Sequence, residues 1–181
     1  MREEDALASQ RYIVAIELDG DPREAQIRLA LPITDGEIRE LFDDQIHWKN
    51  LCEWSKRDGR VVARKREYFG TLTLNDQIWK DVGDAELAAA MLDGVRDLGL
   101  TLTPSAERFL ARVRLAPDEF AGFDEGTLLQ ELDDWLLPYL TGVKTSEAWR
   151  KFDITPALKA RLNWDQQSKL DRLAPLSLIH I

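Results

Sequence analysis

The chain has 181 residues, of which 44% are hydrophobic and 31% are charged. This composition is typical of a soluble globular protein and is sufficient for one large domain or two small ones. No stretch approaches the roughly 20 apolar residues that a membrane-spanning helix needs, and the acidic segment Met1–Gln10 lacks the apolar core of a secretory signal. Cys52 is the only cysteine, which excludes an internal disulfide and favours a reducing, cytoplasmic location.

The charge is acidic but unevenly distributed. A formal net charge of −9 argues against a protein whose whole surface binds nucleic acid. A local basic strip can nevertheless contact phosphates, with an affinity that falls as salt rises. The candidate nucleic-acid-binding residues are Lys56, Arg57, Arg60, Arg64, Lys65 and Arg66. The alternative is that these side chains form the solvated face of a hairpin.

The first part of the chain has the period of β-strands. Apolar residues alternate in residues 12–18 and again in 25–31, a pattern that predicts strands with one inward face. Between them, Asp19-Gly20-Asp21-Pro22 has the composition of a turn. The two segments therefore predict a β-hairpin, which Pro32 ends because proline cannot donate to a ladder.

A short helix and three further strands follow. Thr34 and Glu37 have the spacing of a capping box at the start of a helix. Strands are expected at about 46–54, 60–68 and 69–74, the first two joined by a turn at Asp58-Gly59. Five short antiparallel strands favour a small OB-like barrel, because closing a sheet removes its exposed edges. An open meander is the alternative.

From residue 84 onward the apolar period becomes that of helices. Longer helices are expected over 84–98, from Thr103-Pro104 onward, and over 124–136; shorter ones are expected over 146–152, 156–162 and 164–173. The predicted fold class is thus α+β. Residues 1–80 form an OB-like β-rich domain, residues 84–175 a helical C-terminal domain, and residues 176–181 an atypical tail.

The sequence predicts no catalytic, cofactor-binding or metal-binding residues in this chain. It lacks the phosphate-binding patterns G-x-x-x-x-G-K-[ST] and G-x-G-x-x-G and the nucleophile pattern G-x-S-x-G. One cysteine cannot form a cysteine-cluster zinc site, and His47 is expected to be an ordinary strand residue. Six tryptophans could stack bases, but most are expected in the core, with at most one in a binding role.

Two stretches carry a family resemblance. The first is Trp54–Asn75, WSKRDGRVVARKREYFGTLTLN; the second, Met91–Pro175, contains MLDGVRDLGL, LLQELDDWLLPYLTGV and LNWDQQSKLDRLAP. In their order and spacing they resemble the C-terminal half of the HrpB family of bacterial DEAH-box ATP-dependent RNA helicases, from about Tyr12 to Pro175. The tail LSLIHI departs from the family pattern, which indicates a truncated or altered terminus.

The resemblance implies a parent enzyme that uses ATP hydrolysis to move along or remodel RNA. ATP and Mg²⁺ would bind in two upstream RecA-like motor domains, none of whose motifs is in this sequence. Relatives carry an OB-type barrel after the motor, preceded by further sequence, so a first strand of the barrel is expected to lie before residue 1. In the family the basic run after V-V-A-R is often longer, and here Glu67 interrupts it.

These observations predict a non-catalytic accessory fragment of an ATP-dependent RNA helicase that assists nucleic-acid binding. Its expected partners are single-stranded RNA and its own helicase motor domains. The alternative is a structural or protein-docking module that braces the motor or recruits another protein. An independent enzyme has no supporting constellation of residues.

Overall fold

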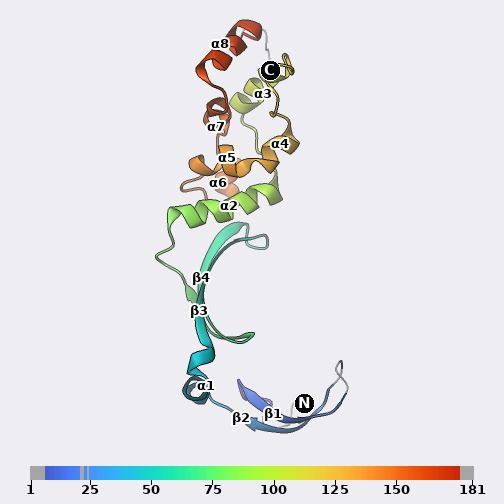
Figure 1. Cartoon of the computed structure of the whole chain (residues 1–181), viewed down its shortest axis with the longest axis vertical. Helices are drawn as coiled ribbons and strands as arrows, with labels where there is room; N and C mark the ends of the chain where they lie inside the picture. The colour runs from blue at the N-terminus through green and yellow to red at the C-terminus, as the bar shows by residue number, and fades with distance from the viewer. Residues whose placement is uncertain (1–6, 21–22, 24, 176–181) are drawn as a thin grey trace. The chain divides into compact units, whose positions relative to one another are not determined.

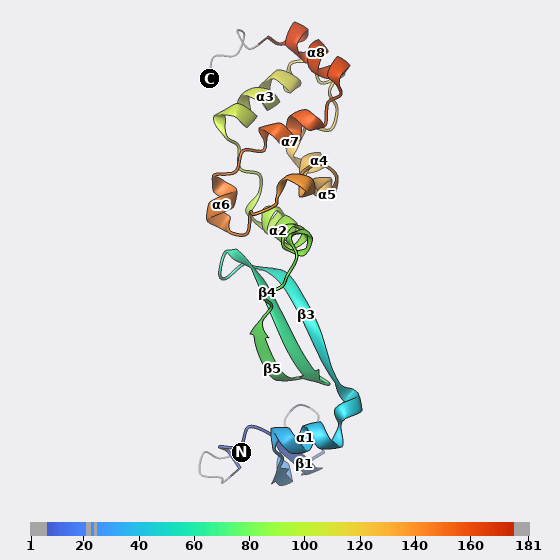
Figure 2. The ribbon, with the colours of Figure 1, turned by 90° about the vertical axis from the view of Figure 1, so that its left-hand side faces the viewer.

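The structure is a computed structural model that describes residues 7–20, 23 and 25–175. It is a mixed arrangement of two small sheets and several helices (Figures 1 and 2). The atypical tail, residues 176–181, lies outside the described residues. Within the described ranges, no helix is long and apolar enough to cross a membrane.

The elements follow one another in the order that the apolar periods predict, strands first and helices after. The first part contains β1 (Ile13–Leu18), β2 (Ile27–Pro32), α1 (Asp35–Leu41), η1 (Asp43–Gln45), β3 (Ile46–Ser55), β4 (Arg60–Phe69) and β5 (Leu72–Ile78). The second part contains α2 (Asp84–Leu98), α3 (Pro104–Arg114), α4 (Glu125–Gln130), α5 (Leu132–Trp135), η2 (Leu137–Tyr139), α6 (Ser146–Arg150), α7 (Thr155–Ala160) and α8 (Trp164–Leu173).

The chain forms two compact units. The N-terminal unit consists of Met1–Lys49 and Lys65–Gln77, and the helical unit consists of Asn50–Arg64 and Ile78–Ile181. The long hairpin of β3 and β4 therefore contributes to both units. Its outer part, residues 50–64, belongs with the helices. Its inner part, residues 46–49 and 65–69, belongs with the N-terminal strands.

The OB-like barrel is not confirmed. Within the described ranges the strands form two separate sheets, β1-β2 and β3-β4-β5, and neither closes on itself. A helix and a 3₁₀ turn, α1 and η1, connect β2 to β3, so the two hairpins are not joined into one continuous sheet. The second sheet has the strand order of the open meander.

The β1-β2 sheet does not bury the side chains that its alternation predicted to face inward. β1 and β2 pair antiparallel, with Val14 opposite Leu31 and irregular register between Ala15 and Leu18. The large aliphatic side chains of this hairpin are 42–57% exposed. We call them the β1-β2 aliphatic face: Val14, Ile16, Leu18, Ile27, Leu29 and Leu31. A two-stranded sheet has no second layer of its own to cover such a face.

Local sequence signals define most helix starts. Thr34 and Glu37 form the predicted capping box of α1. Thr103 caps α3 with Pro104 at the first helical position, and Asp124 caps α4.

The helix predicted over residues 124–136 is divided into α4 and α5. Glu131, between them, has φ −101° and ψ 21°, outside helical geometry. The Leu128 carbonyl accepts a hydrogen bond of 2.9 Å from the indole of Trp135. In a continuous helix that carbonyl would accept from the amide four residues later. A local hydrogen bond from a side chain to the main chain therefore spans the point where the helix is interrupted.

The main hydrophobic core lies in the helical unit and includes the fully buried Trp149. The Trp149 indole donates to the Gly99 carbonyl at 3.0 Å, which satisfies its polar atom inside the core. The other large side chains with almost no exposure are Met91, Leu92, Leu128, Leu132, Leu136, Leu140, Ile154 and Leu158.

Candidate nucleic-acid interface

The turn of the β3-β4 hairpin presents the first candidate residues. Gly59 has a φ of +61°, a conformation that side chains with a Cβ rarely adopt. The hydroxyl of Ser55 donates to Asp58 at 3.0 Å and accepts from its amide at 3.3 Å. These bonds fix the loop that carries Lys56 and Arg57.

The tip of this hairpin is anchored to the helical unit by backbone hydrogen bonds. The amide of Val61 donates to the Lys144 carbonyl, and the amide of Ser146 donates to the Gly59 carbonyl, each at 2.8 Å. An isolated antiparallel bridge joins Arg60 to Thr145 between them. The tip is therefore docked on the helical unit and not a free loop.

Lys56 takes part in the same docking. It forms an ion pair with Asp97, which also accepts a bond of 3.1 Å from the indole of Trp54. The hydrogen bond from Lys56, followed by that from Trp54, lowers the pKa of Asp97 below its ordinary value. Lys56 is still 77% exposed, so a phosphate could reach it. Binding a phosphate in place of Asp97 would, however, weaken the docking of the hairpin.

Arg57 and Arg60 are exposed at the tip. Arg57 is 90% exposed and pairs with its neighbour Asp58 at 3.1 Å. Surface pairs of this kind contribute little to stability. Arg57 therefore gives up little on binding a phosphate, and Arg60 projects from the adjacent strand position.

The remaining candidates divide between the units. Arg64, in the helical unit, is half-buried, and Lys65, in the N-terminal unit, is exposed. The Lys65 ammonium lies 5.8 Å from the centroid of the Trp48 ring. Arg66 pairs with Asp76 at 3.1 Å, and hydrogen bonds to Tyr68 and then to Asp76 raise its pKa.

The six candidates therefore do not form a uniform row of open cations. Lys56 and Arg66 form ion pairs with carboxylates from other elements. Arg57, Arg60 and Lys65 are exposed, and no ion pair with another element is described for them. The spacing in the sequence indicated the cluster, but the partners come from distant positions that local pattern does not reveal.

Glu67, which interrupts the basic run, is a structural residue. Its side chain is 7% exposed, and both oxygens accept from the guanidinium of Arg39 on α1, one of them at 2.8 Å. Arg39 also donates to Asp35 at 2.7 Å. Glu67 thus holds α1 on the inner part of the hairpin.

Pattern reasoning did not single out a second group near the inner end of the hairpin. The rings of His47 and Tyr68 stack with centroids 6.0 Å apart. His47 and Lys49 are both exposed. The period of two, which places His47 and Lys49 on one face of β3, was the signal that could have found them.

The tryptophans are less uniformly buried than expected. Trp135 and Trp149 are buried, and Trp54 and Trp79 are half-buried. Trp48 is 43% exposed, and Trp164, the first residue of α8, is 79% exposed.

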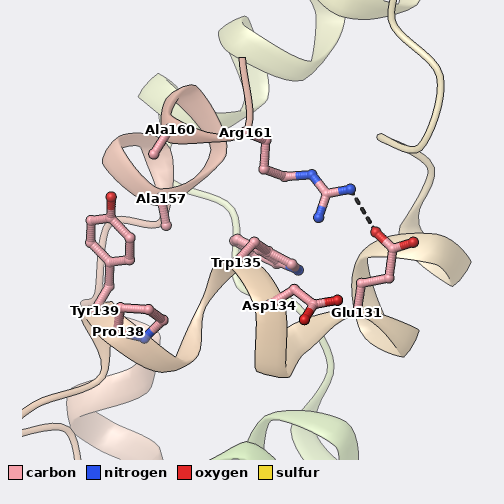
Figure 3. Close-up of a pocket in the computed structure, with 8 residues that line it drawn as sticks. All are labelled: Glu131, Asp134, Trp135, Pro138, Tyr139, Ala157, Ala160 and Arg161. Atoms are coloured by element: carbon pink, nitrogen blue, oxygen red, sulfur yellow. Dashed lines mark hydrogen bonds and ion pairs between the residues drawn. The ribbon is translucent and has the colours of Figure 1, made fainter. Parts of the chain in front are cut away.

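A cavity of about 520 Å³ lies between α5, η2 and α7 of the helical unit (Figure 3). Arg161 crosses it to form an ion pair of 2.6 Å with Glu131, and its guanidinium lies over the ring of Phe123 at 5.4 Å. Trp135 and Tyr139 line the apolar side. The only basic side chain lining the cavity is thus already paired, and the lining includes no serine, cysteine or histidine that could act as a nucleophile or a base.

Cys52 has no features of a reactive thiol. Its Sγ lies 3.4 Å from the Glu86 carbonyl, to which it donates, and burial raises the pKa of the thiol. Reactive cysteines have lowered pKa values. Over the part of the chain that the structure covers, no three histidine, cysteine or acidic side chains gather as a metal site would require.

Comparison with known proteins gives a consistent family assignment. A family model described as "ATP-dependent helicase C-terminal" matches residues 135–180. The ATP-dependent RNA helicase HrpB of Escherichia coli (strain K12) is 32% identical over 94% of this chain. The chain belongs to the HrpB family, to whose C-terminal region it corresponds.

The chain spans 22% of the length of that HrpB relative. Two crystal structures also match: the E. coli DExH-box NTPase HrpB, at 32% identity over 93% of this chain, and the Escherichia coli DEAH/RHA helicase HrpB, at 29% over 94%. This chain covers 22% of each of those chains, with TM-scores of 0.46 and 0.49. The HrpB assignment rests on sequence, because TM-scores below 0.5 do not establish a common arrangement.

Proposed function

We propose that this HrpB-type chain is a non-catalytic accessory region of an ATP-dependent RNA helicase and helps its motor to hold single-stranded RNA. The observation that carries the proposal is the pair of exposed cations at the tip of the β3-β4 hairpin, Arg57 and Arg60, with Lys65 as a separate exposed cation of the N-terminal unit. Exposed arginine and lysine side chains supply the phosphate contacts on which most nucleic-acid affinity depends.

The proposal assigns ATP hydrolysis to the parent protein. ATP and Mg²⁺ would be held by motor domains of the kind that an HrpB helicase carries, since this sequence has no phosphate-binding loop. The contribution of this chain is electrostatic. With three phosphate contacts, the logarithm of affinity falls with the logarithm of salt with a slope of roughly −2.

Charge reversal tests the proposal. We expect the triple variant Arg57→Glu, Arg60→Glu and Lys65→Glu to lose most of the chain's binding to a fluorescein-labelled single-stranded RNA in an anisotropy titration. A triple variant of exposed cations on the helical unit, Arg114→Glu, Arg150→Glu and Lys151→Glu, makes the same change in net charge. Equal loss in the two variants would show that only overall charge matters and would remove the hairpin from the proposal.

A second candidate function is docking on the motor, and the β1-β2 aliphatic face favours it. Six large aliphatic side chains lie exposed on one small sheet, and contiguous exposed apolar surface of this kind marks protein contacts. This chain covers 22% of the length of the HrpB relative, so the remaining 78% of a protein of that length could cover this face. The proposed occupant is the helicase's own motor.

Hydrogen exchange tests the docking candidate. Amides of β1 and β2 should become protected when a separately expressed HrpB motor is added to the chain. The double variant Ile16→Lys and Leu29→Lys, which charges the aliphatic face, should abolish that protection. Unchanged exchange in the unmodified chain would exclude the face as a motor contact.

A further inference from the structure

We propose that the ring pair His47 and Tyr68, on one face of the β3-β4-β5 sheet within the N-terminal unit, stacks unpaired bases of single-stranded RNA. The inference rests on the proposed function, because it presupposes that this chain binds RNA. It adds a stacking site to the phosphate contacts, formed by residues outside the basic cluster.

The alternation of side chains places the two rings on one face. His47 and Lys49 are two residues apart on β3, and Arg66 and Tyr68 are two residues apart on β4, so each pair shares a face. The ring contact of His47 with Tyr68 shows that these are the same face of the sheet.

The opposite face is partly occupied. Glu67 receives the guanidinium of Arg39 from α1, and the ring of Phe69 stacks on Phe42 at 4.8 Å. Helix α1 and the residue that follows it therefore cover that face at Glu67 and Phe69. On the face of His47 and Tyr68, Leu74 of β5, two residues from the Asp76 that pairs with Arg66, is 3% exposed. The accessible part of this face therefore lies at His47 and Lys49.

The surface around His47 and Tyr68 combines the two features that single-stranded nucleic acid requires. His47 is exposed and Tyr68 is half-buried, so the ring pair retains accessible surface for stacking a base. Lys49, exposed and next on the same face of the strand, provides a cation for the adjoining phosphate.

The other charged side chains on this face contribute little net positive charge to the site. Arg66 is held by Asp76 at 3.1 Å. Its positive charge is therefore largely neutralised. Stacking should dominate over charge at this site, unlike at the hairpin tip.

A comparison of two probes separates stacking from phosphate contacts. We would titrate the full chain with labelled U12 RNA and with a labelled 12-mer of the same ribose-phosphate backbone without bases. The variant His47→Ala/Tyr68→Ala should bind U12 about tenfold more weakly or worse, since aromatic stacking is worth about that factor per base. Its affinity for the abasic probe should stay within about twofold.

Matched variants protect the test against misfolding. Tyr68→Phe keeps the ring and should retain most of the U12 affinity. Trp164→Ala removes an exposed aromatic from α8 of the helical unit and should leave U12 binding unchanged. If the double variant has lost its native circular dichroism, His47→Ala alone, which removes one exposed ring, is the deciding variant, with an expected loss of about threefold or more.

The outcomes distinguish this inference from the function on which it rests. U12 binding that survives in the ring variants, or that weakens equally for both probes, would overturn the stacking site and leave the hairpin contacts in place. Failure of the unmodified chain to bind either probe would overturn both.

Discussion

The six-membered ring of Trp54 lies so close to Gly94 that no side chain fits between them. A Cβ built on Gly94 would approach Cε3 of the ring to 2.7 Å and Cδ2 to 2.8 Å. Gly94 is on α2 and Trp54 is near the end of β3. The hairpin that carries the exposed cations is thus held on the helical unit by a contact that requires glycine.

Gly94→Ala should therefore destabilise the helical unit. Overpacking of this kind costs about 1–3 kcal/mol, offset by the gain of about 0.5–1 kcal/mol from removing a helical glycine. Urea unfolding followed by circular dichroism would measure the net loss. The control is Gly36→Ala in α1, where a Cβ would have no neighbour closer than 4.0 Å; a stability loss as large in that variant would contradict the steric explanation.

The pair between Lys56 and Asp97 should make the stability of the docked hairpin depend on acid pH. Because the folded-state pKa of Asp97 is lowered, its contribution is present above its unfolded pKa, about 3.9. The contribution is lost as pH falls through the lower folded value. Asp97→Asn should be less stable than the unmodified chain at pH 7, and the difference should shrink below about pH 4. A difference that is constant from pH 7 to pH 3 would exclude the carboxylate as its source.

Glu67 should contribute to stability and not to RNA binding. Glu67→Ala removes both bonds from Arg39 and should cost about 1–3 kcal/mol of unfolding free energy. The double variant Arg39→Met/Glu67→Leu should lose less, because it removes the buried carboxylate together with its guanidinium and leaves only the more exposed Asp35 without a partner. Denaturant unfolding measures both. An unchanged free energy of unfolding in Glu67→Ala would show that the buried pair does not hold α1.

Trp135→Phe tests the break between α4 and α5. The substitution leaves the Leu128 carbonyl without its indole donor, and a buried acceptor without a partner costs about 1–3 kcal/mol. Trp164→Phe, at a side chain that is 79% exposed, should change stability by less than about 0.5 kcal/mol. Thermal unfolding of the two variants would give the comparison, and similar losses would count against the proposed role of the indole.

Local signals in the sequence predicted local structure well. The capping box of Thr34 and Glu37 and the turn at Asp58-Gly59 appear where their chemistry places them. Each depends on residues a few positions apart, so the chain around them contains the whole cause.

What the sequence could not give are the contacts between distant segments. Closure of a barrel would require pairing between the β1-β2 hairpin and the second sheet, and alternation within a strand does not specify its partner. The single helix predicted over 124–136 is interrupted where Trp135 bonds to Leu128, a contact invisible to helical periodicity. Likewise, two candidate cations are paired with carboxylates from other elements: Lys56 with Asp97 and Arg66 with Asp76.

The measurement that tests the central claim most directly is fluorescence anisotropy of a labelled single-stranded RNA titrated with this chain at low and moderate salt. We expect binding at low salt that weakens as salt rises, because exposed cations of the β3-β4 hairpin contact the phosphates. Absence of binding even at low salt would contradict the RNA-holding role and leave docking on the motor as the function of this region.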